Sequence, residues 1–140
     1  MSRIFWDTNL YIYLLEGSGP FFERVVALRK AMLARGDHLL TTALTLGEVL
    51  VKPMEKGDSA LSRRYEEGIL ASSQVIAFDE KAARIYARLR GDRSLRAPDA
   101  MQLACAARAG TDLFITNDLR LQSKKVDGIQ FIVALEQAPL

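Results

Sequence analysis

The chain has 140 residues, of which 49% are hydrophobic and 26% are charged, and this balance predicts one globular domain over residues 1–140. No apolar run reaches the roughly 18 residues that span a bilayer, and the N-terminus lacks a signal-peptide pattern, so we expect no membrane partner. The single cysteine, Cys105, excludes an intrachain disulfide. It fits the reducing cytoplasm, where we expect the protein to reside.

Hydrophobic periodicity and turn residues predict strands that alternate with helices. In chain order, the expected elements are a strand over residues 2–6, helices over 10–15 and 22–33, a strand over 38–42, helices over 45–54 and 59–72, a strand over 74–78, helices over 80–89 and 99–109, and strands over 113–116 and 129–133. Asp79 is expected to cap its helix, and residues 91–97 form a polar loop that carries arginines.

This order of elements indicates an α/β domain with a mainly parallel central sheet of four to five strands flanked by helices. Sheets of this kind place their ligand sites beyond the carboxyl ends of the strands. Asp7 follows the first predicted strand, and Asp118 follows the fourth. Asp99 begins a helix near other strand ends, and Glu48 would reach the same region from within a helix.

These four acids border strongly apolar segments, where an unpaired carboxylate is costly. Each also has an ordinary structural explanation. Asp7 can cap a helix, and Asp118 can begin a turn. Asp99 can interact with a helix dipole, and Glu48 can be exposed or pair with Lys52 one turn later. Their joint occurrence favours a shared site, because gathered carboxylates repel each other unless a cation lies between them.

Oxygen ligands suit Mg²⁺ or Mn²⁺, whereas one histidine and one cysteine argue against zinc. Such an ion lowers the pKa of a bound water and neutralises charge on a phosphate during hydrolysis. The net charge is +2, from 19 basic and 17 acidic residues. Without the four acids, 19 − 13 leaves an excess of six positive charges, which suits a polyanionic substrate. A metal-dependent hydrolase is therefore the leading hypothesis.

Four short motifs occur in order along the chain. They are FWDTN at residues 5–9, TLGE at 45–48, APDA at 97–100 and FITND at 114–118. Together they resemble the motifs of the PIN-domain ribonucleases, and among these the VapC-type toxins of toxin–antitoxin pairs. The resemblance covers essentially the whole chain.

The resemblance implies a PIN-like three-layer fold and a Mg²⁺- or Mn²⁺-dependent endoribonuclease that hydrolyses RNA phosphodiester bonds. The catalytic and metal-binding residues that it implies are Asp7, Glu48, Asp99 and Asp118. It assigns supporting roles to Thr8, Asn9 and Thr116. It also implies a homodimer and a cognate antitoxin, whose C-terminal segment covers the site and often presents an arginine to the acids.

One departure from this family pattern follows Asp118. Many relatives carry a further acid there, whereas this chain continues with Leu119, Arg120 and Leu121. We therefore expect one firmly held metal ion, with any second ion depending on the substrate. Gln102 lies one helical turn after Asp99 and is expected to support the site or to contact the substrate.

Basic residues are concentrated just before Asp99. They are Arg84, Arg88, Arg90, Arg93 and Arg96. These arginines could bind the RNA backbone or form a solvated surface, and the loop position favours RNA binding most for Arg93 and Arg96. Lys124 and Lys125 are expected in an exposed turn.

Two other functions remain open at this point. The first is a PIN-type nuclease that processes RNA without an antitoxin. The second is a non-catalytic α/β regulatory module that binds Mg²⁺. A receiver module of that kind would need a phosphorylatable aspartate after the third strand, where Asp79 is better explained as a helix cap. It would also leave Glu48 and Asp99 unexplained.

Overall fold

A five-stranded sheet forms the centre of the structure, a computed structural model that describes residues 1–140. Its strands are β1 (Arg3–Trp6), β2 (His38–Thr42), β3 (Gln74–Ile76), β4 (Thr111–Ile115) and β5 (Ile129–Val133). They lie in the order β3-β2-β1-β4-β5, and every neighbouring pair is parallel. The predicted α/β class is confirmed, and the sheet is parallel throughout.

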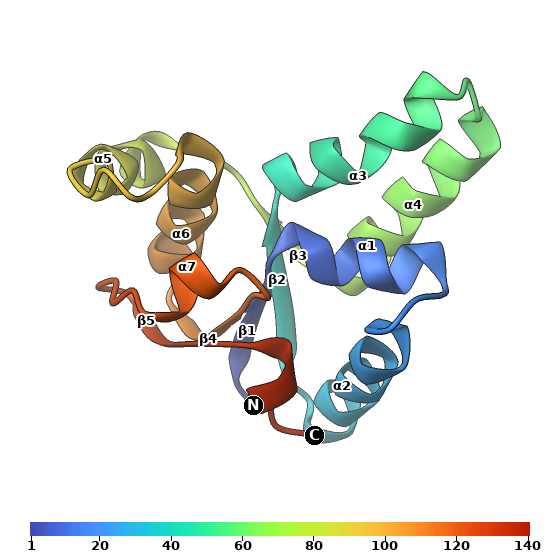
Figure 1. The fold of residues 1–140 in the computed structure, drawn as a ribbon, viewed down its shortest axis with the longest axis horizontal. Helices are drawn as coiled ribbons and strands as arrows, with labels where there is room; N and C mark the ends of the chain where they lie inside the picture. Colours follow the sequence, from blue (N-terminus) through green and yellow to red (C-terminus); the bar gives the residue numbers. More distant parts are fainter.

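Helices cover both faces of this sheet (Figure 1). They are α1 (Thr8–Glu16), α2 (Phe22–Arg35), α3 (Ala43–Glu55), α4 (Ser59–Ser72), α5 (Glu80–Leu89), α6 (Ala97–Ala109) and α7 (Leu119–Gln122), followed by the short 3₁₀-helix η1 (Leu135–Gln137). Helices α1 to α4 lie on one side and α5 to α7 on the other, which is the expected three-layer arrangement. None of them has the length and apolar character of a membrane span.

Helices α3 and α6 begin earlier than predicted, and a side-chain cap explains the early start of α3. The hydroxyl of Thr42 accepts a hydrogen bond from the backbone N–H of Thr45, so α3 begins at residue 43. Pro98 lies within the first turn of α6, where its missing N–H costs nothing. Helices α7 and η1 were not predicted, because four and three residues are too few to carry a periodic signal.

Side chains from β1 enter both cores, since successive residues of a strand point to opposite faces. Ile4 and Trp6 pack with α1, α2 and α4, and Phe5 packs with α6 and β4. The ring of Phe5 stacks on Phe114 with centroids 4.8 Å apart, and Trp6 meets Tyr11 edge-on at 5.3 Å. All four large residues are buried, so the strand ends that follow them are firmly placed.

The strand order brings the end of β1 beside the end of β4. Trp6 pairs with Ile115, and the backbone N–H of Asp7 donates to the carbonyl of Ile115 at 3.0 Å. From β1 the chain builds β2 and β3 to one side and later β4 and β5 to the other. Such a change of direction opens a crevice beyond the carboxyl ends of the two central strands, where parallel sheets bind ligands.

Candidate active site

A pocket of about 760 Å³ contains all four of the acids singled out in the sequence. Asp7 and Asp118 enter it from the ends of β1 and β4, Glu48 from α3, and Asp99 from the first turn of α6. The remaining lining comes mainly from α1, α3 and α4. The structure therefore brings together residues that are up to 111 positions apart in the sequence: two that follow strands, one at the start of a helix, and Glu48 from the middle of another helix.

Asp7 is the most deeply buried of the four acids, with an exposed fraction of 9%. It caps α1 by accepting from the backbone N–H of Thr8 at 2.8 Å, and its other oxygen accepts from the hydroxyl of Thr116 at 2.7 Å. Burial raises the pKa of Asp7 above its ordinary value, the two hydrogen bonds oppose this, and the charges of Asp99 and Glu48 add to it. A cation in the pocket would offset the repulsion between the charges of these acids.

A buried network of hydroxyl and amide groups lies next to the acids. Nε2 of Gln102 donates to the hydroxyls of Thr8 and Thr45 at 2.9 and 2.8 Å, and its Oε1 accepts from Thr42. Because these residues belong to α6, α1, α3 and the end of β2, the network joins the elements that carry the acids. The supporting role predicted for Gln102 is consistent with this geometry. The sequence did not reveal the supporting roles of Thr45 in α3 and Thr42 in β2. Thr42 could have been recognised, because a threonine that ends a strand and caps the next helix is a usable signal.

Glu48 reaches the site through a single hydrogen bond. Its Oε1 accepts from the hydroxyl of Thr8 at 2.8 Å, and the residue is otherwise exposed on α3. The alternative explanation of Glu48, an ion pair with Lys52, is wrong. The ammonium of Lys52 lies 3.6 Å from the carboxylate of Glu16 instead, and both residues line the same pocket.

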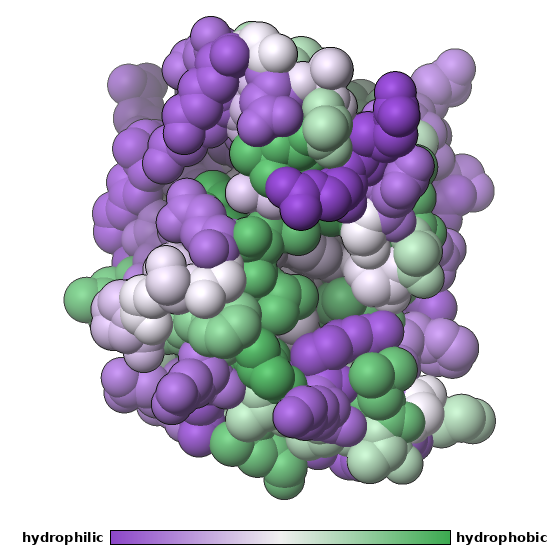
Figure 2. All heavy atoms as spheres, turned by 90° about the vertical axis from the view of Figure 1, so that its right-hand side faces the viewer, coloured by the Kyte–Doolittle hydropathy of each residue, from purple (hydrophilic) through white to green (hydrophobic).

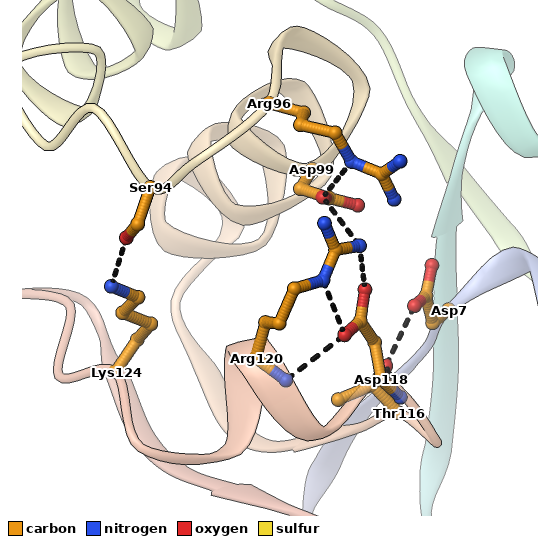
Figure 3. A network of polar contacts seen from close by, with 8 residues as sticks. All are labelled: Asp7, Ser94, Arg96, Asp99, Thr116, Asp118, Arg120 and Lys124. Atoms are coloured by element: carbon orange, nitrogen blue, oxygen red, sulfur yellow. Dashed lines mark hydrogen bonds and ion pairs between the residues drawn. The ribbon is translucent and has the colours of Figure 1, made fainter.

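Two arginines hold the remaining acids (Figure 3). Nε of Arg96 lies 3.5 Å from Asp99, and Nη2 of Arg120 lies 3.6 Å from the same carboxylate oxygen. Arg120 also binds Asp118 through two hydrogen bonds, which lower the pKa of Asp118. From the sequence, Arg120 was recognised only as one of the residues that replace an acid after Asp118. Its spacing of two residues from Asp118, at a helix start, was the signal that could have revealed it.

Two other predicted site residues, Asn9 and Arg93, form no side-chain hydrogen bond or ion pair with the protein. The exposed Asn9 lines the pocket, but its side chain makes no hydrogen bond. Arg93 is exposed in the loop before α6 and forms no ion pair. Lys125 is exposed as expected, whereas Lys124 is half-buried and its ammonium binds Asp92 at 2.7 Å and Ser94 at 2.5 Å. This bridge fastens the loop from which Arg96 extends.

The donor set suits a hard divalent cation, although it is not a preformed chelate. No three histidine, cysteine, aspartate or glutamate side chains lie close enough together to hold one ion. Mg²⁺, however, is commonly bound by one or two carboxylates together with waters and a substrate phosphate. Asp7 and Asp99 both line the pocket, and the charge of Asp99 raises the pKa of Asp7, which makes the two acids candidate ligands of such an ion.

Fold and site together define a class of protein, an α/β nuclease-like domain with acids gathered at the strand ends. Residues 4–127 match the family model of the PIN domain. This match spans most of the chain, and the chain belongs to the PIN-domain family, a family of nucleases. No curated protein sequence matches the chain.

Solved structures show the same fold. FitAcB from Neisseria gonorrhoeae is 27% identical, with a TM-score of 0.67 over 83% of this chain and 88% of that chain. VapBC2 from Rickettsia felis, solved with a DNA fragment from its promoter, is 12% identical with a TM-score of 0.75 over 94% and 98%. DNA-bound VapBC from Salmonella typhimurium is 21% identical with a TM-score of 0.69 over 96% and 99%.

Proposed function

We propose that this protein is a Mg²⁺- or Mn²⁺-dependent endoribonuclease and the toxin of a VapC-type toxin–antitoxin pair. The observation that carries the proposal is the meeting of Asp7, Glu48, Asp99 and Asp118 on one pocket of a PIN domain. Burial raises the pKa of Asp7, and the charges of Asp99 and Glu48 raise it further, which supports a functional site with a role for a cation.

Asp7 and Asp99 would hold the ion directly, and Glu48 directly or through bound water. Asp118, both of whose oxygens are bound by Arg120, would lie beside the ion. The ion would supply a water of lowered pKa and neutralise charge on the scissile phosphate. The protein's own part is to fix the acids. Thr116 orients one oxygen of Asp7, and the Thr8 backbone N–H orients the other. This preorganisation reduces the rearrangement needed when substrate arrives.

RNA is the proposed substrate because the site is acidic while the rest of the chain carries an excess of basic residues. Arg96 lines the pocket beside Asp99, and Arg93 lies exposed in the same loop. We assign both to the RNA backbone. The cytoplasm, where such a substrate is found, is the proposed compartment.

An antitoxin is the proposed partner, in line with the VapBC complexes among the structural neighbours. Beyond the acids, the pocket continues along an apolar wall formed by Ile12, Leu15, Val51 and Leu61. Figure 2 shows apolar side chains gathered across the middle of the face on the α1–α4 side. Such a wall suits the apolar side of an antitoxin segment that ends with an arginine at the acids. A homodimer is the proposed form of the free protein, and size-exclusion chromatography with light scattering tests it.

Cleavage assays test the enzymatic part of the proposal. Purified protein should cleave RNA with Mg²⁺ or Mn²⁺ and stop when EDTA is added. Asp7→Asn and Asp99→Asn should each lower the cleavage rate by about 100-fold or more, since an acid of the metal site is lost. Asp127→Asn is the matched control, because Asp127 is exposed in a turn away from the pocket. Equal activity of wild type and the two site variants would contradict the proposal.

Growth experiments separate the toxin from the other functions. Expression of the wild-type protein should arrest growth, Asp99→Asn should not, and a small adjacent gene product should rescue growth. Metal-dependent cleavage without arrest or rescue would instead indicate a PIN-type RNA-processing nuclease. Metal binding without cleavage would indicate a regulatory module.

A further inference from the structure

Arg120 is a charged residue beside the acids that has no role in the proposed hydrolysis. It lies in the first turn of α7, two residues after Asp118, which caps that helix. Its Nε donates to Oδ1 of Asp118 at 3.0 Å, and its Nη2 donates to Oδ2 at 2.5 Å. Its backbone N–H also donates to Oδ1 at 2.9 Å. One arginine thus occupies both oxygens of Asp118, in the two-pronged geometry that orients a guanidinium most firmly.

The guanidinium of Arg120 lies between two carboxylates of the pocket, as Figure 3 shows. Its Nη2 is 3.6 Å from Asp99, on the side opposite to Arg96. Its Nη1 makes no hydrogen bond or ion pair with the protein, and 48% of the side chain is exposed. The edge of the guanidinium that is not bound to Asp118 therefore keeps free donors beside the acids.

The four acids are only partly compensated by arginine. Arg96 and Arg120 form ion pairs with Asp99 and Asp118. Asp7 and Glu48 form no ion pair with the protein, and when ionised their two negative charges are what one Mg²⁺ or Mn²⁺ can neutralise. A second ion would need further acids, whereas no three potential ligands gather and the chain has arginine after Asp118.

We infer that Arg120, held in place by Asp118, is a catalytic residue that binds the phosphate of the RNA substrate and supplies a second positive charge beside a single metal ion. This inference rests on the proposed nuclease function. One edge of the guanidinium stays on Asp118 while the other donates to phosphate oxygens, which the planar fork of arginine permits. Asp118 is then a positioning residue that acts through Arg120, and Asp7 and Asp99 are the acids that bind the ion.

Binding measurements test the two parts separately. Mn²⁺ binding is followed by the loss of the electron paramagnetic resonance signal of the free ion. RNA binding is followed in EDTA by the anisotropy of a fluorescein-labelled 20-nucleotide RNA of mixed sequence. Arg120→Ala should weaken RNA binding about tenfold and change the Mn²⁺ dissociation constant by no more than about threefold. Asp118→Asn should also weaken RNA binding about tenfold and leave Mn²⁺ binding within about threefold of wild type. Asp99→Asn, in contrast, should weaken Mn²⁺ binding about tenfold or more.

Cleavage rates with Mn²⁺ complete the test. Arg120→Ala should lower the rate about 100-fold, as expected for the loss of a fixed donor to a developing charge. Arg120→Lys should recover part of the RNA binding, since it keeps the charge but loses the fork. The double variant with Asp118→Asn should be no worse than Arg120→Ala alone, because the two residues act as one unit. Arg108→Ala is the control, since Arg108 pairs with Asp79 near the far end of α6.

Three results would overturn this role of Arg120 while leaving the nuclease intact. Arg120→Ala could bind Mn²⁺ tenfold more tightly and cleave as well as wild type, which would make Arg120 a counter-ion that the metal displaces. Asp118→Asn could weaken Mn²⁺ binding as much as Asp99→Asn does. Arg120→Ala could also leave RNA binding and cleavage unchanged. A wild-type protein that neither binds Mn²⁺ nor cleaves RNA would instead overturn the proposed function, and this role with it.

Discussion

Thr116 shows how one hydroxyl connects two acids of the site. The residue is fully buried at the end of β4, where its hydroxyl donates to Asp7 at 2.7 Å and accepts from the backbone N–H of Asp118 at 3.0 Å. A hydroxyl can do both at once because it has one donor and two acceptor positions. Its supporting role was expected from the resemblance, whereas the link between the two acids is visible only in the structure.

Thr116→Val should lower the free energy of unfolding by about 1–3 kcal/mol, because it keeps the volume but leaves the buried partners of the hydroxyl unsatisfied. Urea unfolding measures the change. Thr116→Ser, which keeps the hydroxyl, should retain more of the stability. If the valine variant is as stable as the serine variant, the two hydrogen bonds contribute nothing.

Asp7 should make stability depend on pH in the direction opposite to most acids. Burial raises its native pKa, so its contribution to folding is present below the ordinary value of 3.8 and is lost as the pH rises through the raised pKa. Asp7→Asn should therefore stabilise the metal-free protein more at about pH 7 than at about pH 4.5. Thermal melts in EDTA across this range provide the measurement.

Asp79 provides the control of opposite sign. Its pKa is lowered, first by the hydrogen bond from the backbone N–H of Ala82, so its stabilising effect is present at neutral pH and is lost as the pH falls through the lowered value. Asp79→Asn should destabilise the protein most at neutral pH. The same pH trend in both variants would refute the raised pKa of Asp7.

Among the elements, the turn before β5 approaches α6 so closely that only glycine fits there. Gly128 has φ +96°, and a Cβ there would lie 2.7 Å from the carbonyl oxygen of Ala107 in α6. The approach matters because α6 carries Asp99 at its other end. A shift of the helix against the sheet would move this acid relative to the acids at the strand ends.

Gly128→Ala should destabilise the protein by about 2–4 kcal/mol, because backbone strain and a backbone clash add together. Gly19→Ala is the matched control, with φ +102° but no atom within 4 Å of the added Cβ, and should cost only about 1 kcal/mol. Denaturant midpoints compare the two variants. Equal losses would mean that α6 moves away from the new methyl group without cost.

At the scale of the whole molecule, a metal ion should stabilise the folded state because the unfolded chain does not assemble the acids. At 100 times the dissociation constant, Mn²⁺ should add about 2.7 kcal/mol to the free energy of unfolding, and EDTA should reverse the effect. Asp7→Asn and Asp99→Asn should lose this response, as measured by differential scanning fluorimetry. If both variants are stabilised by Mn²⁺ as much as the wild-type protein is, these acids are excluded as ligands.

Most elements were predictable because their signals are local. The strand before Asp7 and the capping role of Asp79 follow from neighbouring residues, and both are present in the structure. Helix starts were less accurate, as at α3, because Thr42 acts as a cap while still belonging to a strand by its pattern. The short helix α7 could not be predicted from periodicity, and with it the position of Arg120 was missed.

The sequence by itself determined which residues end strands or begin helices, and therefore which acids could face a common edge, since these properties depend on a few neighbouring residues. The tertiary structure alone decided that β1 lies beside β4 and that Gln102 joins three elements beneath the acids. It also decided that Arg120 occupies both oxygens of Asp118 and approaches Asp99. These contacts depend on strand order and side-chain packing between distant segments, which no local pattern records.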